Sequence, residues 1–217
     1  MSITTPDAQP SPEASASVSL RRDESARQAD ARDRADMEQL VAGRDAALND
    51  LMERHATPLF HFLCRMVGNE DDANDLAQET FVRVFRARAS FRTSERFSTW
   101  LFTIAANLAR NHFRWRARHP NVSLDTETGE KEQTLGSTLP ANEQAPNEQA
   151  LTAERARAVR AAVGKLPEDL REAIVLCEWE EYSVAEAAMI LETTPKAVES
   201  RLYRARQILR ERLKQWL

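Results

Sequence analysis

Residues 166–213, LPEDLREAIVLCEWEEYSVAEAAMILETTPKAVESRLYRARQILRERL, decide the fold. After a break at Leu166-Pro167, the spacing of apolar residues predicts a helix from about Glu168 to Trp179 and a short one from Ser183 to about Leu191. The pair Thr194-Pro195 is a helix cap followed by proline at the first helical position, so a final helix begins there. A short helix, a tight turn and a longer basic helix form a helix-turn-helix unit.

The composition extends this helical prediction to the whole chain. Only five of the 217 residues are glycine, while Ala, Leu, Arg and Glu dominate. We therefore expect an all-α protein, without the glycine-rich loops that bind phosphates or dinucleotides. Cys64 and Cys177 stand far apart with no CxxC pair, so neither a disulfide framework nor a zinc site is expected, and no cofactor is implied. The sequence shows no secretory start and no stretch near the roughly 20 apolar residues of a membrane span, which predicts a cytoplasmic protein.

Two small helical domains are expected, separated by a flexible acidic linker. Residues 1–35 hold almost no large apolar side chains and are predicted to be a disordered extension. Residues 119–149 are rich in Pro, Gly and acids, with six acids against one lysine between positions 125 and 150, and are predicted to be the linker. The compact domains would then be 36–118 and 150–217, each near the lower size limit for folding alone.

The first domain is predicted to be helical throughout. Apolar residues recur at three- and four-residue steps on both sides of Pro58, and Gly68 with Asn69 ends that pattern. A second helix is predicted to begin among the acids of residues 70–72, which suit the positive end of a helix dipole. After a loop, the last helix should run from about Ser98 to Arg118.

Charge is strongly segregated along the chain. Between Arg83 and Arg118 there are nine arginines and a single acid, whereas residues 70–80 carry five acids and no base. Arginine and aromatic side chains together bind phosphates and stack on unpaired bases. Six aromatic residues from position 91 onward lie among those arginines: Phe91, Phe97, Trp100, Phe102, Phe113 and Trp115. This combination indicates nucleic-acid binding, the alternative being an ordinary solvated face. In the last helix of the first domain, one polar stripe can reach base edges as well as phosphates: Asn107, Arg110, Asn111 and Arg114.

Three runs resemble the two domains of an extracytoplasmic-function sigma factor, the small two-domain class of bacterial sigma factor. They are DDANDLAQETFVRVFRA at 71–87, FSTWLFTIAANLARNHFR at 97–114 and the opening run at 166–213. The resemblance implies a promoter-specificity subunit and not an enzyme. Such a subunit binds core RNA polymerase through the clamp coiled coil and the flap, and directs it to promoter DNA.

The resemblance also assigns roles to residues. The clamp contact falls on the acidic helix, whose acids could alternatively do no more than cap it: Asp72, Asp75, Gln78 and Glu79. The −10 element would be read by a loop that holds a flipped base, together with the polar stripe: Arg92, Ser94, Arg96, Ser98, Trp100, Asn107, Arg110, Asn111 and Arg114. The −35 element would be read as duplex by the final helix, which is otherwise an ordinary amphipathic helix: Thr194, Lys196, Glu199, Ser200, Arg201, Tyr203 and Arg204.

Glu199 departs from the basic residue that this family often carries at that place. Its carboxylate could accept a hydrogen bond from cytosine N4, or it could repel a phosphate. The −35 sequence that relatives prefer therefore cannot be assumed for this chain. The resemblance further implies that the acidic linker threads the polymerase channels, and that an anti-sigma factor inhibits the protein.

Three other functions remain open from the residues. A helix-turn-helix regulator could bind operators as a dimer without polymerase, but it would leave the acidic helix unexplained. A nucleic-acid enzyme would need acids or histidines near the basic cleft, and the four histidines show no metal-binding spacing. A pure interaction module that sequesters polymerase would not use its arginines on promoter DNA.

Overall fold

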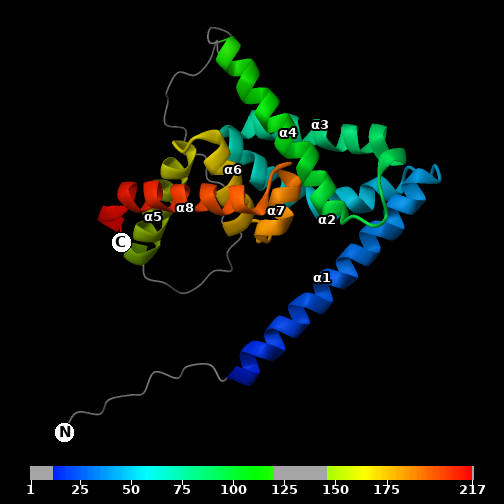
Figure 1. Cartoon of the computed structure of the whole chain (residues 1–217), viewed down its shortest axis with the longest axis horizontal. Coiled ribbons are helices and arrows are strands. Elements are labelled where there is room, and N and C mark those ends of the chain that lie inside the picture. Colours follow the sequence, from blue (N-terminus) through cyan, green and yellow to red (C-terminus); the bar gives the residue numbers. More distant parts are fainter. Residues whose placement is uncertain (1–11, 120–145, 217) are drawn as a thin grey trace.

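The structure is a computed structural model that describes residues 12–119 and 146–216 (Figure 1). Within those ranges the chain is helical and contains no strand, which confirms the all-α prediction. The first domain comprises α1 (Pro12–Val41), α2 (Ala47–Val67), α3 (Glu70–Ala87), the short 3₁₀ helix η1 (Arg88–Ser90) and α4 (Phe97–Arg118). The second comprises α5 (Pro146–Gly164), α6 (Glu168–Glu178), α7 (Val184–Ile190), α8 (Pro195–Arg212) and η2 (Lys214–Trp216).

The helix boundaries follow from capping residues that the sequence displays. Gly68 ends α2 in the left-handed conformation at φ 74°, and the Asn69 side chain accepts a hydrogen bond from the backbone N–H of Asp72 at 2.9 Å to start α3. Ser183 and Glu186 form a reciprocal capping box at α7. The Thr194 side chain caps α8 by accepting a hydrogen bond from the Ala197 N–H at 3.2 Å, and Pro195 is the first residue of that helix. The predicted helix-turn-helix unit is therefore present.

Pro58 does not interrupt the helix that contains it. The sequence shows the apolar pattern resuming after this proline, whereas α2 runs unbroken from Ala47 to Val67. Proline removes one backbone hydrogen bond, but Leu51, Leu59 and Phe62 on either side of it are fully buried. Burial of this common face outweighs the lost bond.

The prediction of disorder up to residue 35 is wrong for residues 12–35, which belong to α1. Asp33 is only 2% exposed and lies within 2.9 Å of Arg54 Nε and 2.8 Å of His55 Nε2. Burial pushes the pKa of Asp33 up, but the hydrogen bonds with His55 and Arg54 outweigh it and leave that pKa lowered. Ion pairs of Asp30 and Asp33 hold the later part of this segment, and a search for apolar residues does not detect them. The predictions for residues 1–11 and most of the linker (120–145) fall outside the described residues.

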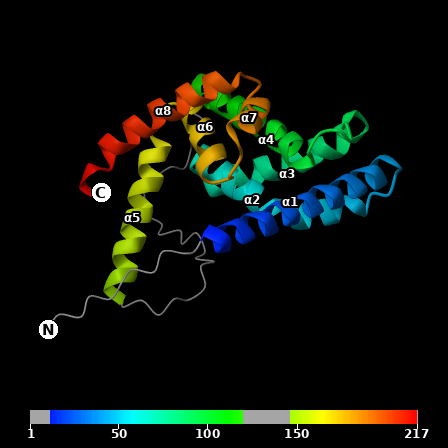
Figure 2. The same ribbon diagram turned by 60° about the horizontal axis from the view of Figure 1, so that its bottom comes forward.

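The two domains pack directly against each other. In Figure 2, α6 and α7 lie beside α2 and α4, and the ring of Tyr182 meets Phe102 edge-on at a centroid distance of 5.3 Å. One connected cluster of buried side chains runs from Met37 in α1 to Ala205 in α8. The arrangement of the two charged surfaces is therefore fixed by a shared apolar core. No helix in the described ranges is long and apolar enough to cross a membrane.

Candidate nucleic-acid interface

The acidic face of α3 is largely open to solvent. Asp75 and Gln78 are exposed, and Glu79 accepts a hydrogen bond from Arg83 Nε at 2.8 Å. Asp72 lies 3.4 Å from both Arg116 Nη1 and His112 Nε2 of α4. Capping is performed by Asn69, so these acids are not needed to begin the helix and remain available to a basic partner.

The predicted polar stripe of α4 forms an ordered network. Arg110 Nη1 donates to Asn107 Oδ1 at 2.8 Å, and Arg114 Nη2 donates to Asn111 Oδ1 at 2.7 Å. Asn111 and Arg114 are exposed, whereas Arg110 turns towards the second domain. The four side chains therefore share one face of α4, as the sequence predicts, but they are not equally accessible.

The loop before α4 carries the other candidates for the −10 element. Arg92 and Ser94 are exposed, while Ser98 and Trp100 are half-buried. Arg96 forms ion pairs with Asp30 of α1 at 2.8 Å and with Glu186 of α7. Burial lowers the pKa of Arg96, but the hydrogen bonds to Asp30 and Glu186 outweigh it and leave that pKa raised.

Most of the aromatic residues among the arginines belong to the core. Phe97 and Phe102 are 2% and 3% exposed, and Trp100 packs on Phe91 at a ring distance of 5.2 Å. These buried rings are therefore not exposed for stacking on bases. Their spacing reflects the buried face of α4, and only Trp115, at 45%, is a large exposed aromatic residue of this segment.

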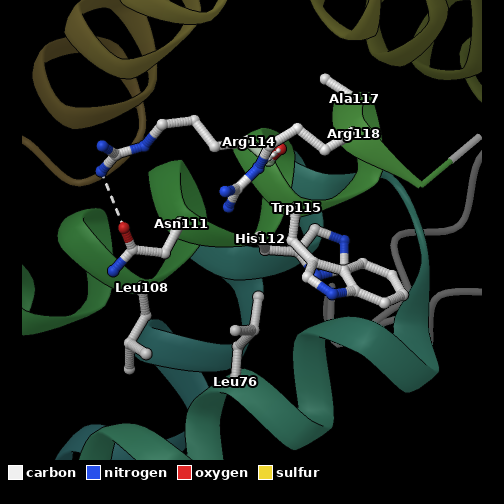
Figure 3. A pocket seen from close by; sticks show the side chains of 8 residues that line it. All are labelled: Leu76, Leu108, Asn111, His112, Arg114, Trp115, Ala117 and Arg118. Carbon is white, nitrogen blue, oxygen red and sulfur yellow. Dashed lines mark hydrogen bonds between the residues drawn. The ribbon is translucent and has the colours of Figure 1, made fainter.

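Trp115 lies in a groove of 790 Å³ between α3 and the end of α4. Figure 3 shows Leu76 and Leu108 on the floor, Trp115 beside His112, and Arg114 hydrogen-bonded to Asn111 at the rim. The indole stacks on His119 with ring centroids 4.8 Å apart. This groove extends the polar stripe with an apolar surface that the sequence does not reveal.

The final helix α8 presents to solvent most of the residues predicted to read the −35 element. Val198, Leu202 and Ala205 form its buried face. The opposite face is exposed: Thr194, Lys196, Glu199, Ser200, Tyr203 and Arg204. Arg201 differs, since its half-buried side chain lies 3.8 Å from Asp169 Oδ2 of α6.

Sequence reasoning missed the acids of the second domain that approach the first. Glu172 of α6 accepts a hydrogen bond from Arg110 Nε at 2.7 Å, and Glu180 accepts one from Arg65 Nη1 at 3.1 Å. Burial raises the pKa of Glu172 despite the opposing Arg110, and raises that of Glu180 to about 7. No local pattern marks these residues, because each partner lies in the other domain.

The described residues hold no cluster of three or more His, Cys, Asp or Glu side chains suited to a metal ion. Cys64 and Cys177 are half-buried. Burial raises the pKa of Cys64 to about 11 and also raises that of Cys177, so both thiols are protonated at neutral pH.

Comparison with known proteins assigns both domains. The sequence model of sigma-70 region 2 matches residues 51–119, and that of sigma-70 region 4 matches residues 156–209. The ECF RNA polymerase sigma factor SigW of Bacillus subtilis is 32% identical over 179 residues, which cover 82% of this chain and 95% of SigW. The chain belongs to the extracytoplasmic-function sigma factors.

Further relatives and solved structures agree with this assignment. The sigma-E factor of Haemophilus influenzae is 33% identical, covering 83% of this chain and 95% of that protein. CnrH in complex with the cytosolic domain of CnrY matches with a TM-score of 0.62 at 30% identity, covering 85% of this chain and 98% of CnrH. RpoE of Bartonella quintana, in complex with the anti-sigma factor NepR, matches with a TM-score of 0.57 at 27% identity, covering 76% and 96%. The sigma-factor fold thus accounts for both helical domains.

Proposed function

We propose that this chain is an alternative sigma factor, which binds core RNA polymerase and directs it to specific promoters. The observation that carries the proposal is the pairing, in one chain, of sigma-70 region 2 and an exposed helix-turn-helix face in region 4. Polymerase supplies the chemistry, so the sigma factor itself contributes binding and strand opening. That role would place the chain in the cytoplasm with polymerase.

The core contact is assigned to the open acidic face of α3, made of Asp72, Asp75, Gln78 and Glu79. Its charge suits a basic partner surface, and three of the four lie on one helical face at steps of three and four residues. In this proposal the face docks on the polymerase clamp coiled coil, while region 4 approaches the flap.

Promoter recognition divides between the two domains. The −10 element is assigned to the loop and α4, where Arg92, Asn111 and Arg114 are exposed and an unpaired base could be held. The −35 duplex is assigned to α8, whose exposed N-terminal residues include Lys196, Ser200 and Arg204.

An anti-sigma factor is the expected inhibitor. The sigma factor RpoE, a solved structure with this fold, is held in a complex with the anti-sigma factor NepR, and CnrH is held in a complex with the cytosolic domain of CnrY. A comparable partner of this chain would keep both promoter-reading surfaces from DNA.

Charge reversal on α3 tests the core contact. Replacing Asp75 and Glu79 together with Lys should abolish holoenzyme assembly, measured by the mobility or anisotropy of the labelled sigma factor with purified core. Helical content should be unchanged, because both positions lie away from the core. A matched control reverses Glu199 and Glu211, two exposed acids of α8, and should leave assembly intact. Unchanged core affinity of the α3 variant would contradict the assignment.

A further inference from the structure

The loop at residues 91–96, which we call the −10 loop, is contacted by a helix outside the residues that match sigma-70 region 2. That match begins at residue 51, whereas α1 ends at Val41. In Figure 2, α1 runs along α2, and it also contacts η1 and α4, the two elements that flank the loop. The helix α1 is therefore adjacent to both ends of the −10 loop.

Asp33 fixes α1 against α2. Its buried carboxylate lies 2.9 Å from Arg54 Nε and 2.8 Å from His55 Nε2. Asp36, three residues further along α1, pairs with the same Arg54. Because side chains three residues apart project from one face of a helix, these contacts determine which face of α1 is turned towards the rest of the domain.

His55 links α1 to the base of the −10 loop. Its ring meets the ring of Phe97 edge-on, with centroids 5.1 Å apart. Phe97 is buried, and its ring lies 6.2 Å from the rings of both Phe91 and Trp100. The aromatic cluster beneath the loop therefore packs on the residue that Asp33 holds.

Asp30 lies on the same face of α1, one turn before Asp33, and contacts the loop itself. Its Oδ2 lies 2.8 Å from Arg96 Nε, and the two side chains are 25% and 42% exposed. A pair this open to solvent adds little to stability, so its effect is mainly geometric. A guanidinium held through Nε presents its two outer nitrogens in a fixed direction. Arg96 also pairs with Glu186 of the second domain, but the Asp30 contact is made within the first.

We propose that Asp30 is a positioning residue for promoter recognition: it fixes the direction of the Arg96 guanidinium on the −10 loop and thereby sharpens the base preference of that loop. Asp30 acts through Arg96 and does not touch DNA itself, because its carboxylate would repel phosphate. The inference rests on the proposed function for the identity of the DNA element. The ordering of the loop by α1 does not depend on polymerase.

The first measurement follows hydrogen exchange of the −10 loop in the full chain without polymerase. The amide of Glu95, which donates to the carbonyl of Arg92 at 2.9 Å, reports whether the turn inside the loop is formed. Asp30→Ala should speed exchange of the loop amides about threefold, because Arg96 then loses its partner on α1. Asp30→Glu keeps the carboxylate and should stay close to the wild type. The matched control is Glu38→Ala, which removes an exposed acid from the same helix and should not change the exchange of the loop.

The second measurement is holoenzyme transcription from a promoter library randomised in the −10 element. Asp30→Ala should weaken discrimination between bases about three- to tenfold at one or two −10 positions, because Arg96 is no longer aimed. The −35 preference should stay the same. Asp30→Glu should restore the −10 preference, and Glu38→Ala should behave as the wild type.

A charge swap separates positioning from simple stabilisation of the loop. The double change Asp30→Arg with Arg96→Asp keeps an ion pair between α1 and the loop but moves the guanidinium onto α1. Hydrogen exchange of the loop should then return to the wild-type rate, while the −10 preference stays altered. Recovery of both properties would show that Asp30 only stabilises the loop, and would contradict the positioning role.

The proposal would also be overturned by loop exchange in Asp30→Ala no faster than in Glu38→Ala, or by an unaltered −10 preference of Asp30→Ala. Circular dichroism checks that each variant is folded, and Asp30→Glu provides the comparison in which the charge is kept. A wild-type chain that gives no transcripts with core polymerase would instead contradict the sigma-factor assignment. Hydrogen exchange would then still decide whether Asp30 orders the loop.

Discussion

Glu199 is an exposed acid on the face of α8 that also carries Lys196, Ser200 and Arg204. A carboxylate at this position can accept a hydrogen bond from cytosine N4 but repels phosphate. An arginine there would instead donate hydrogen bonds to guanine or phosphate. The identity of this one side chain is therefore expected to set part of the −35 preference.

Glu199→Arg should shift the preferred −35 sequence and leave the −10 preference alone. A bidentate base contact is worth about 1–3 kcal/mol, so one or two positions should change by roughly tenfold or more. The measurement is holoenzyme transcription from a randomised promoter library, with Glu211→Arg, near the end of α8, as control. An unmoved −35 preference would mean that α8 enters the groove in another orientation.

The turn between α7 and α8 contains a strained backbone position. Glu192 has φ 52°, and the bonds from Glu192 N–H to Met189 O and from Thr193 N–H to Ala188 O form a Schellman cap. Left-handed backbone costs a residue with a Cβ roughly 1–2 kcal/mol, more than the 0.5–1 kcal/mol that glycine loses in chain entropy.

Glu192→Gly should therefore stabilise the helix-turn-helix unit by about 0.5 kcal/mol. Glu192→Ala removes the same carboxylate but keeps the strain, so it should give no such gain. Urea unfolding at equal m-value measures both. A glycine variant no more stable than the alanine variant would show that the turn is not strained.

Helix ends could be predicted from the sequence, because their determinants are local. Gly68, Asn69 and the Thr194-Pro195 pair each act within a few residues, and each marks a boundary in the structure. The effect of Pro58 could not be predicted locally, because a long-range property, burial of the apolar residues on both sides of it, decides whether a proline breaks a helix.

The ordered contacts of α1 before residue 36 and the pairing of the domains could not be predicted in this way. Asp33 is stabilised by Arg54 and His55, more than 20 positions away, and Glu172 meets Arg110 across 62 positions. The positions of the stripe residues on α4 were predictable from helical periodicity. Which of them the second domain covers was not, because no periodicity links α4 to α6.

For the molecule as a whole, the charged boundary between the domains makes stability depend on pH. Burial raises the pKa of Glu180 to about 7, with Arg65 of α2 opposing it, while an unfolded glutamate titrates near 4.5. Between these values the folded chain holds a proton that the unfolded chain lacks, so stability is greatest near pH 5 and falls as the pH rises through 7. Asp33 and Glu186, whose pKa values are lowered, lose their contribution only below about pH 4.5.

The melting temperature should accordingly be higher at pH 5.5 than at pH 8. Glu180→Gln should reduce that difference by about 2–4 °C for each kcal/mol of pH-dependent stability that Glu180 contributes. Part of the difference should survive in the variant, because burial also raises the pKa values of Glu168 and Glu172. Differential scanning calorimetry of both chains at both pH values gives the comparison. Equal pH effects in the two chains would exclude Glu180 as a source.

The measurement that tests the central claim most directly is in vitro transcription with core RNA polymerase and a library of promoter sequences. The account predicts that transcripts from a defined −35 and −10 pair appear only when both core and this chain are present. It also predicts that the core-free chain binds the selected duplex weakly. Tight, sequence-specific binding of that duplex by a core-free dimer, with no transcripts when core is added, would contradict it.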